Sequence, residues 1–408
     1  MSAFSRRQFI GGSAAAVAVG TSLGGTSAAA RSDVPEPIRG KDGGTIPGPI
    51  NNPIDRENPD LLVPPSTDAG VLPNLKYSMS DAHMHLLDGG WVRQVNVQQL
   101  PVATTLAGVE MRLEPGAIRE LHWHQQSEWA LMLAGRAQVT AVDDHGRNFT
   151  GDVSEGDLWF FPAGFPHSIQ GLKEGCEFLL VFDDGNFSDL GTFMVTDWFN
   201  HTPLSVLAKN FGVPQRAFAN VPSESERYIF PGQVPPPAAA NSVPSPAGTI
   251  PRSFTHRLTA QTPLKTPWGT VRIVDSSNFS PSTTTAAALI EVDPGGMREL
   301  HWHPNADEWQ YYIEGQARMT VFAAEGRANT FDYQAGDVGY IPYPMGHYIE
   351  NTGSEALRFL EMFRSSYYAD VSLDTWLALT PPEMVRATLD LDRSTISKLR
   401  KRERPVVG

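Results

Sequence analysis

The phrase Arg-Glu-Leu-His-Trp-His occurs twice in this chain, at residues 119–124 and again at 298–303. Each copy is followed by a glutamate and, after a turn rich in Gly and Pro, by a third histidine: Glu128 and His167 in the first copy, Glu308 and His347 in the second. Repetition on this scale indicates two tandem copies of one domain, since the repeats of a solenoid are much shorter. The repeat therefore predicts a chain built as two related halves.

The residues around each phrase predict an all-β domain followed by short helical segments. Runs that alternate apolar and polar residues are broken by Gly, Pro and Asp, a pattern typical of antiparallel strands. Residues 202–211 have the periodicity of a helix, and the chain becomes helical again after residue 380. The basic stretch KLRKRER near the end is interpreted as a solvated helix terminus.

Composition divides the chain into five segments. Residues 31–76 are rich in Pro, Gly and Asp without a sustained period, which predicts an extended arm, and residues 231–251 have the composition of a linker. The complete division is an export signal (1–30), the arm (31–76), the first domain (77–222), a linker (223–252) and the second domain with C-terminal helices (253–408).

The first thirty residues predict export. Arg6 and Arg7 precede a stretch of small apolar residues that ends in Ala28-Ala29-Ala30, a cue for signal cleavage. The paired arginines resemble a twin-arginine signal, with a plain secretory signal as the alternative. We therefore expect an exported protein, periplasmic or secreted. The one cysteine, Cys176, excludes a framework of disulfides and is expected to pack in the core.

The charge balance limits the class of partner. A formal net charge of −13 argues against nucleic acid, because such binding depends on basic contacts to phosphate. Beyond the export signal, the sequence contains no apolar run long enough to span a membrane. An acidic surface also repels small anions, so an anionic ligand would need a local attraction such as a metal ion or a buried arginine.

The repeated histidines and glutamates predict two metal sites. His122, His124 and Glu128 are separated by even numbers of positions, so on one strand they would project from the same face. The two expected ligand sets are His122, His124, Glu128 and His167, and His301, His303, Glu308 and His347. Three imidazoles and a carboxylate suit a divalent ion such as Mn, Fe, Ni, Cu or Zn, and geometry decides among them. A further pair, His83 and His85, has no third ligand in the sequence and is interpreted as non-functional.

These motifs resemble a known family. The patterns H-x-H-x(3,4)-E-x(6)-G and G-x(5)-P-x(4)-H, present in both copies, resemble the two signature motifs of the cupin superfamily. Longer stretches from about residue 33 onward, such as EGDLWFFPAGFPHSIQ, DEWQYYIEGQARMTVF and YYADVSLDTWLA, resemble the oxalate decarboxylases. The resemblance implies two jelly-roll β-barrels, hence a bicupin, with one Mn(II) in each barrel and positions open to oxalate and dioxygen. It also implies a homo-oligomer, a hexamer.

Two arginines precede the histidine pairs. Arg119 and Arg298 stand three residues before His122 and His301, and strict strand alternation would point them away from the metal. The family places this arginine in the metal pocket, which requires a bulge between the two residues. There two N–H groups of its guanidinium would donate hydrogen bonds to one carboxylate group of a small dicarboxylate. A surface position is the alternative.

Decarboxylation also needs a proton donor, and two acids are candidates. Glu361 lies between Phe359 and Phe363 on the same strand face, where desolvation would keep it protonated; the first copy has Leu180 at the aligned position. The alternative for Glu361 is a structural hydrogen bond. The second candidate is Asp189.

Asp189 belongs to a segment that resembles the lid of the family, where Ser-Glu-Asn-Ser-Thr is typical and the Glu donates the proton. This chain instead has Ser188, Asp189, Leu190, Gly191 and Thr192. Because Asp is one methylene shorter than Glu, its carboxyl reaches less far. The altered lid keeps two outcomes open.

The sequence thus predicts a Mn-dependent oxalate decarboxylase that forms formate and CO2 with dioxygen as cofactor. The alternative is a bicupin oxalate oxidase that forms CO2 and hydrogen peroxide. A third hypothesis is a non-enzymatic bicupin for storage or binding, against which the complete ligand sets in both barrels argue.

Overall fold

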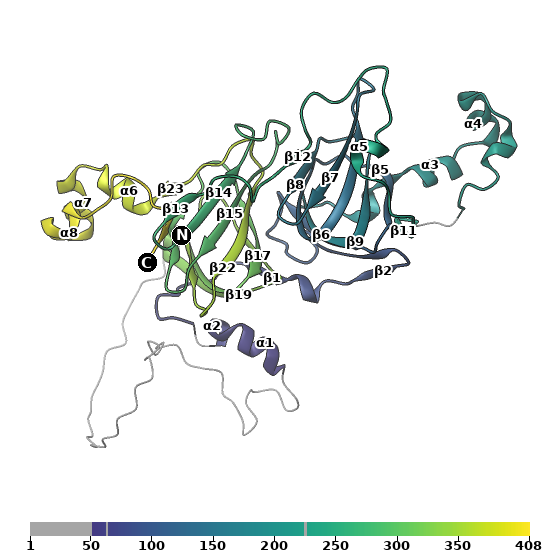
Figure 1. Cartoon of the computed structure of the whole chain (residues 1–408). Coiled ribbons are helices and arrows are strands. Elements are labelled where there is room, and N and C mark those ends of the chain that lie inside the picture. The colour runs from purple at the N-terminus through teal and green to yellow at the C-terminus, as the bar shows by residue number, and fades with distance from the viewer. Residues whose placement is uncertain (1–50, 63, 224–226) are drawn as a thin grey trace, which may run out of the picture.

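A computed structural model describes residues 51–62, 64–223 and 227–408. Figure 1 shows two β-barrels side by side, with a helical extension projecting from the outer side of each. The prediction of an all-β chain with two cupin barrels and short helices is confirmed. The expected export signal and residues 31–50 of the expected arm lie outside the described residues.

The first barrel is held together by two long strands, β6 (Glu128–Val142) and β9 (His167–Phe182), which pair along most of their length. Both strands run through the two layers of the barrel and join them into one sheet. Around them lie β2 (His85–Leu87), β3 (Gly90–Val95), β4 (Ala107–Leu113), β5 (Ile118–Trp123), β7 (Asn148–Ser154), β8 (Leu158–Phe161), β10 (Phe193–Met194) and β11 (Ile229–Phe230).

The second barrel repeats this arrangement in two sheets. One sheet contains β13 (Leu264–Thr266), β14 (Gly269–Val274), β15 (Ala286–Val292), β17 (Glu308–Glu314), β20 (Asp337–Ile341) and β22 (Leu357–Phe363). The other contains β16 (Met297–Trp302), β18 (Gln316–Ala323), β19 (Arg327–Gln334), β21 (Gly346–Asn351), β23 (Val371–Ser372) and β24 (Val406–Val407).

A glycine marks the point where each barrel bends from one layer to the other. Gly135 lies inside β6 at a φ of 73°, where the pairing with β9 shifts register. Gly315 separates β17 from β18 at a φ of 84°. A side chain at Gly135 would meet the carbonyl oxygen of Gly175 at 2.2 Å, so both the backbone angle and the close approach require glycine.

The barrels exchange strands and share a core. Strand β1 (Lys76–Ser78) pairs with β20 of the second barrel, and β12 (Thr255–His256) pairs with β8 of the first. One continuous hydrophobic cluster joins the two barrels and includes Trp129, Phe160, Val181, Trp309, Tyr340 and Met362. Because each half contributes a strand to the other barrel and apolar side chains to the shared cluster, the two barrels are packed as one unit.

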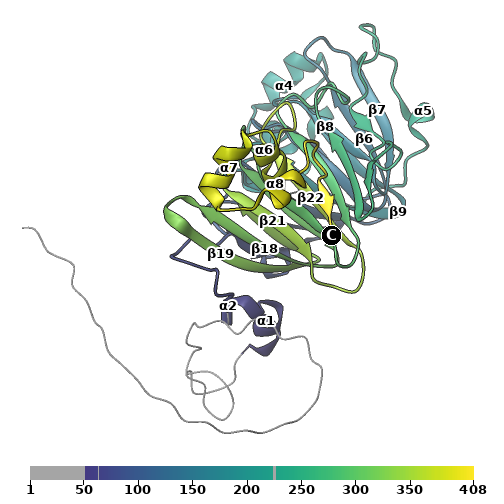
Figure 2. The same ribbon diagram turned by 90° about the vertical axis from the view of Figure 1, so that its left-hand side faces the viewer.

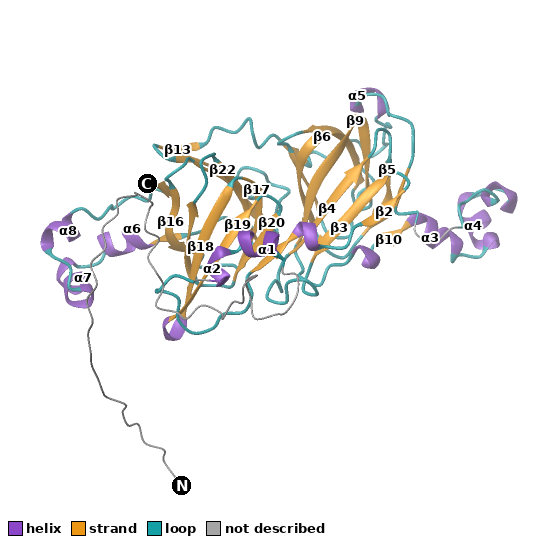
Figure 3. Cartoon of the chain, turned by 90° about the horizontal axis from the view of Figure 1, so that it is seen from below, coloured by secondary structure: helices purple, strands orange, loops and turns teal. Residues whose placement is uncertain are grey.

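Two helical extensions lie at opposite ends of the molecule, as the view from below shows (Figure 3). The first extension contains α3 (Val195–Asn200), α4 (Leu204–Phe211) and the 3₁₀ turn η3 (Gln215–Phe218); the second contains α6 (Leu373–Ala378), α7 (Pro382–Leu389) and α8 (Arg393–Ser397). Figure 2 shows the second extension from its own side of the molecule. A further short helix, α5 (Ala238–Asn241), lies in the interval predicted as a linker.

The segments before and after the second barrel both pack on it. In the arm, α1 (Asn52–Glu57) and α2 (Pro59–Leu62) precede a stretch in which Asp68 accepts a hydrogen bond from the backbone of Thr330 on β19. The basic end is not a solvated helix terminus, because Arg400 pairs with Asp374 and the chain then forms β24 along β16. Among the described residues, no helix is long and apolar enough to cross a membrane.

Candidate metal centres

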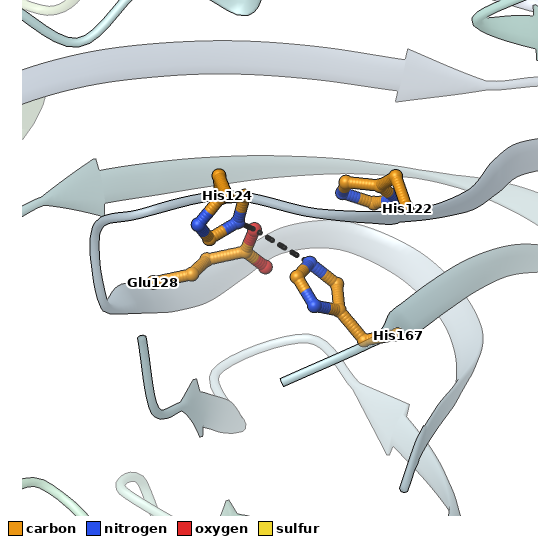
Figure 4. Close-up of side chains that lie close together, drawn as sticks. All are labelled: His122, His124, Glu128 and His167. Carbon is orange, nitrogen blue, oxygen red and sulfur yellow. Dashed lines mark hydrogen bonds and ion pairs between the residues drawn. The ribbon is translucent and has the colours of Figure 1, made fainter. Parts of the chain in front are cut away.

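The first centre is assembled where three strands meet. His122 lies near the end of β5 and pairs with His167, the first residue of β9, while Glu128 begins β6. The prediction that His122, His124 and Glu128 share one strand is wrong, because the chain turns between β5 and β6 and His124 lies in that turn. Figure 4 shows that the four side chains nevertheless point toward one another.

The ligand atoms of the first set lie within 4.8 Å of one another, and all four residues are buried. Glu128 has a divided role, since its Oε1 accepts a hydrogen bond from Trp159 Nε1 at 2.8 Å. Its Oε2 lies 3.3 Å from His124 Nε2 and 3.4 Å from His167 Nε2. The indole therefore holds one carboxylate oxygen while the other faces the imidazoles.

Each histidine of the first set is oriented by its other ring nitrogen. Nδ1 lies 2.5 Å from the carbonyl oxygen of Glu120 in His122, 2.6 Å from that of Gln126 in His124, and 2.8 Å from that of Phe165 in His167. A carbonyl oxygen can only accept, so Nδ1 carries a proton, and in the neutral ring the lone pair then lies on Nε2, which faces the centre. This arrangement is typical of histidines that bind a metal.

The second set repeats this geometry in the second barrel. His301, His303, Glu308 and His347 also place their ligand atoms within 4.8 Å. The three Nδ1 atoms face the carbonyl oxygens of Glu299, Ala369 and Met345 at 2.6, 2.8 and 3.1 Å. Gln310 takes the place of the tryptophan, because its Nε2 donates to Glu308 Oε1 at 2.7 Å.

The polar atoms in both centres fit a bound cation. In the second centre Nε2 of His303 and His347 face Glu308 Oε2 at 3.0 and 2.8 Å, and Nε2 of His301 is buried without a hydrogen-bond partner among the described residues. Burial, followed by the charge of the neighbouring arginine, lowers the pKa of His122 and His301 well below the usual value. Three imidazoles and a carboxylate that converge in a buried cluster form a ligand set for a divalent metal ion, so these are two metal-binding groups.

Arg119 lies beside the first centre, as the bulge hypothesis requires. The pairing of β5 with β9 shifts register between Arg119 and His122, and the Arg119 side chain is buried. Its guanidinium carbon lies 3.5 Å from the centre of the Tyr228 ring, and Nη1 donates to the Tyr228 carbonyl at 3.4 Å. The contact that positions this arginine is thus mainly aromatic stacking.

Arg298 lies at the same place in the second barrel, where β16 has the same register shift. Its surroundings differ, because every nitrogen of its guanidinium has a polar partner. Nε donates to Glu361 at 3.3 Å, Nη1 to the Pro405 carbonyl at 3.3 Å, and Nη2 to Tyr368 Oη at 2.8 Å and Asp370 Oδ2 at 2.5 Å.

Glu361 is fully buried in β22, as its apolar neighbours predict. Burial raises its pKa to about 7, against the opposing effect of Arg298. Strand pairing also confirms that Leu180 is its counterpart: Glu361 lies opposite Ala288 and Gln310, and Leu180 lies opposite Val109 and Ala130. Glu361 thus combines a raised pKa with an ion pair to Arg298.

The expected lid forms the 3₁₀ turn η2 (Asp189–Gly191). The Asp189 backbone donates to Gln94 Oε1 at 3.1 Å, and Asp189 Oδ1 accepts from the Leu190 backbone at 3.0 Å. Asp189 therefore lies partly buried with its carboxylate bound to its own turn, while Leu190 is 81% exposed. Its role as a proton donor stays a prediction.

Several residues of the two centres were not identified from the sequence. Tyr228 lies inside the predicted linker (223–252), and Tyr368 and Asp370 lie between β22 and β23. Trp159 and Gln310 hold the glutamates through hydrogen bonds. The stretch YYADVSLDTWLA contained two of these residues, but spacing alone gave no reason to place them on Arg298. Cys176 is buried, as expected.

Comparisons with known proteins agree with this geometry. The model of the Cupin family matches residues 82–217 and 256–397. The oxalate decarboxylase OxdC of Bacillus subtilis (strain 168) is 56% identical over 377 residues, which cover 92% of this chain and 98% of that protein. An oxalate decarboxylase of Arthroderma benhamiae is 36% identical over 424 residues, covering 96% and 99%. A solved structure of the Bacillus enzyme, from work on its Mn(II) centres, superposes with a TM-score of 0.87 over 92% of this chain and 99% of that chain.

Proposed function

This chain belongs to the cupin family and, within it, to the oxalate decarboxylases, and from this premise we propose that it converts oxalate and a proton to formate and carbon dioxide. The observation that carries the proposal is the first centre, where a complete ligand set adjoins a buried arginine that pairs with no carboxylate among the described residues. A dicarboxylate needs both a metal ion and a guanidinium to balance its charge.

The two ligand sets would each hold one Mn(II), two per chain, and dioxygen serves as a second cofactor. Mn(II), with dioxygen, supplies the reversible one-electron chemistry that weakens the C–C bond of oxalate. The three imidazoles and one carboxylate of each set fit such an ion, and the work on Mn(II) centres in the Bacillus enzyme supports the choice of metal.

Arg119 binds and orients the substrate in this proposal. Its Nη1 donates to the Tyr228 carbonyl at 3.4 Å, and two parallel N–H groups of a guanidinium match one carboxylate of oxalate. Because the residue is buried, water does not weaken this interaction, and the same charge stabilises the electron density that develops as CO2 leaves.

The proton for the formate carbon comes from an acid at the first centre, and Asp189 is the candidate that the lid supplies. The reaction is balanced when oxalate dianion and one proton give formate and CO2. The proton must reach carbon before an electron is lost to dioxygen. Asp189 would have to release its bond to the Leu190 backbone to point inward, so opening of η2 becomes part of the cycle.

The same observation supports a second candidate, an oxalate oxidase. If Asp189 stays bound to its own turn, no donor reaches the carbon, and dioxygen oxidises the intermediate to CO2 with formation of hydrogen peroxide. Formate and peroxide, measured together on manganese-loaded protein at acidic pH under air, decide between them. Formate near one per oxalate supports the decarboxylase, peroxide with little formate supports the oxidase, and the absence of both products refutes each.

We further propose that the protein is exported and forms a homo-oligomer, with the family's hexamer as the expected state. The signal-like residues 1–30 support export. Exposed apolar side chains on both helical extensions support assembly: Leu204, Val206, Phe211, Trp376, Leu379 and Met384. Fractionation of the native host and light scattering on the purified protein test the two proposals.

A further inference from the structure

The two centres have matching ligands but different surroundings for the arginine, and one residue accounts for most of the difference. We propose that Asp370 is a specificity-determining residue that excludes oxalate from the second centre. It does so by pairing its carboxylate with Arg298, whereas no carboxylate among the described residues pairs with the equivalent Arg119. This inference rests on the proposed function, because it takes oxalate as the ligand of the first centre.

Strand pairing identifies the residue that corresponds to Asp370 in the first barrel. Phe193 of β10 pairs with Trp123, and Val371 of β23 pairs with Trp302. The residues immediately before these strands, Thr192 and Asp370, are therefore equivalent. The first barrel has a neutral hydroxyl, buried without a hydrogen-bond partner among the described residues, where the second has a carboxylate.

The carboxylate of Asp370 is fixed on Arg298 from several sides. Its Oδ2 lies 2.5 Å from Arg298 Nη2 and accepts from Tyr368 Oη at 3.1 Å. Burial alone would raise the pKa of Asp370, but the Arg298 charge and hydrogen bonds from Glu403 and Arg298 lower it. The carboxylate is thus ionised and occupies the end of the guanidinium that a substrate carboxylate would need.

The charges near the two centres differ in the same sense. In the first centre the buried charges beside the metal position are one glutamate, Glu128, and one arginine, Arg119, while Asp189 in the lid is only partly buried. The second centre has the same pair, Glu308 and Arg298, and adds Asp370 and, when ionised, Glu361. A bound dianion would therefore meet at least one additional buried negative charge in the second centre, where water screens little.

The backbone contact of the arginine is the same in both barrels. The carbonyl of Pro405, next to β24, accepts from Arg298 Nη1, as the Tyr228 carbonyl next to β11 does from Arg119. Since these contacts match in the two barrels, they do not explain the difference between the two arginines. The side chains on Nε and Nη2 remain as the cause, and Asp370 is the one that is firmly ionised.

The test measures binding, not turnover. Oxalate is titrated by calorimetry into manganese-loaded protein without dioxygen, so that substrate is not consumed. The variant Asp370→Thr carries the residue of the first barrel, and Asp144→Thr removes the same charge from an exposed position (74% exposed). We expect one oxalate per chain for the native protein and the control, and two for Asp370→Thr.

Two further variants assign the sites and guard against misfolding. Adding Arg119→Ala to Asp370→Thr should bring the ratio back to one, because the second centre alone then binds. Asp370→Asn keeps the shape and should give the same second site if Asp370→Thr fails to fold. The reciprocal change Thr192→Asp should weaken oxalate binding at the first centre by about tenfold or more.

The outcomes separate this inference from the function on which it rests. If the native protein binds no oxalate while holding two manganese ions, the proposed function fails. If it binds one and both Asp370 variants also bind one, with metal content unchanged, the function stands and the role of Asp370 is overturned. Two oxalates per native chain would overturn it as well.

Discussion

The two arginines, Arg119 and Arg298, occupy equivalent positions in equivalent barrels and yet have different functions in this account. Each lies buried on the far side of a bulge from its histidine pair. Arg119 stacks on one aromatic ring, whereas Arg298 is fully engaged with two carboxylates, a phenol and a carbonyl. A duplicated ligand set therefore does not imply a duplicated reaction, because the residues around it decide what can enter.

The surroundings also explain why both arginines are retained. A buried guanidinium is costly unless its charge is compensated. In the second barrel the protein itself supplies that compensation, so Arg298 contributes to the fold. In the first barrel part of the compensation is left to the substrate, so Arg119 contributes to binding. The predictions below separate these roles, starting with the largest effect.

Glu128→Gln should remove the metal of the first centre and almost all formate production. The amide cannot supply the negative charge that balances the metal ion. We therefore expect activity to fall by about 10²- to 10³-fold. Metal analysis should find one ion per chain instead of two. Glu308→Gln should lose the other ion and keep formate production, and equal losses in both variants would break the comparison.

Arg119→Ala and Arg298→Ala should fail in opposite ways. Arg119→Ala should lower kcat/KM by about 10²- to 10³-fold with little change in stability, because a charged donor to the substrate is lost. Arg298→Ala leaves two buried carboxylates unpaired and should destabilise the fold by about 3–5 kcal/mol. Steady-state kinetics and chemical denaturation measure the two effects, and loss of activity at native stability in Arg298→Ala would contradict the assignment.

The stability of the metal-free protein should fall as pH rises from about 5 to above 7, and Glu361 should cause part of the fall. Burial raises the pKa of Glu361 from 4.5 to about 7, so the folded protein holds a proton that the unfolded chain releases. This contribution is fully present below the unfolded pKa and is lost as pH rises through the folded one. Its counterpart Leu180 has no such proton.

Glu361→Gln should flatten that decline by up to about 3 kcal/mol. Denaturation at pH 5, 6, 7 and 8 measures the slope, with Leu180→Met as a matched change of an apolar core residue in the first barrel. An unchanged slope in Glu361→Gln would show that the residue does not exchange its proton in this range.

The smallest effect is expected in the lid. Asp189→Glu, Leu190→Asn and Gly191→Ser together should raise the ratio of formate to peroxide by about two- to tenfold, because the longer acid reaches further toward the substrate. A side chain at Gly191 meets nothing within 4 Å, and Leu190 is exposed, so stability should change by less than about 0.5 kcal/mol. An unaltered product ratio would remove the lid from the choice of reaction.

The sequence predicted the parts of the site that short motifs contain. Both ligand sets, the bulge before His122 and the burial of Glu361 followed from spacing, resemblance and local polarity. Asp370 could not be placed, because its contact with Arg298 joins residues on β16 and beyond β22 that only the closed barrel brings together. Likewise, Tyr228 lies next to a short strand, β11, in a region whose composition indicated a linker.

The expectation that alternate residues of one strand face the same side named the correct ligands but the wrong local structure. His122, His124 and Glu128 converge because a turn between β5 and β6 folds them together, not because one strand presents them on one face. The exchange of β1 and β12 between the barrels was also outside the reach of sequence periodicity. Such short strands carry no pattern of their own and depend on the partner barrel for their pairing.

The most direct test of the comparison between the two barrels is a crystal structure of the manganese-loaded protein with oxalate in the absence of dioxygen. This account predicts oxalate at the first centre, with one carboxylate on Arg119, and an intact Arg298–Asp370 pair at a second centre without oxalate. Oxalate bound at the second centre, with Arg298 turned away from Asp370, would contradict it.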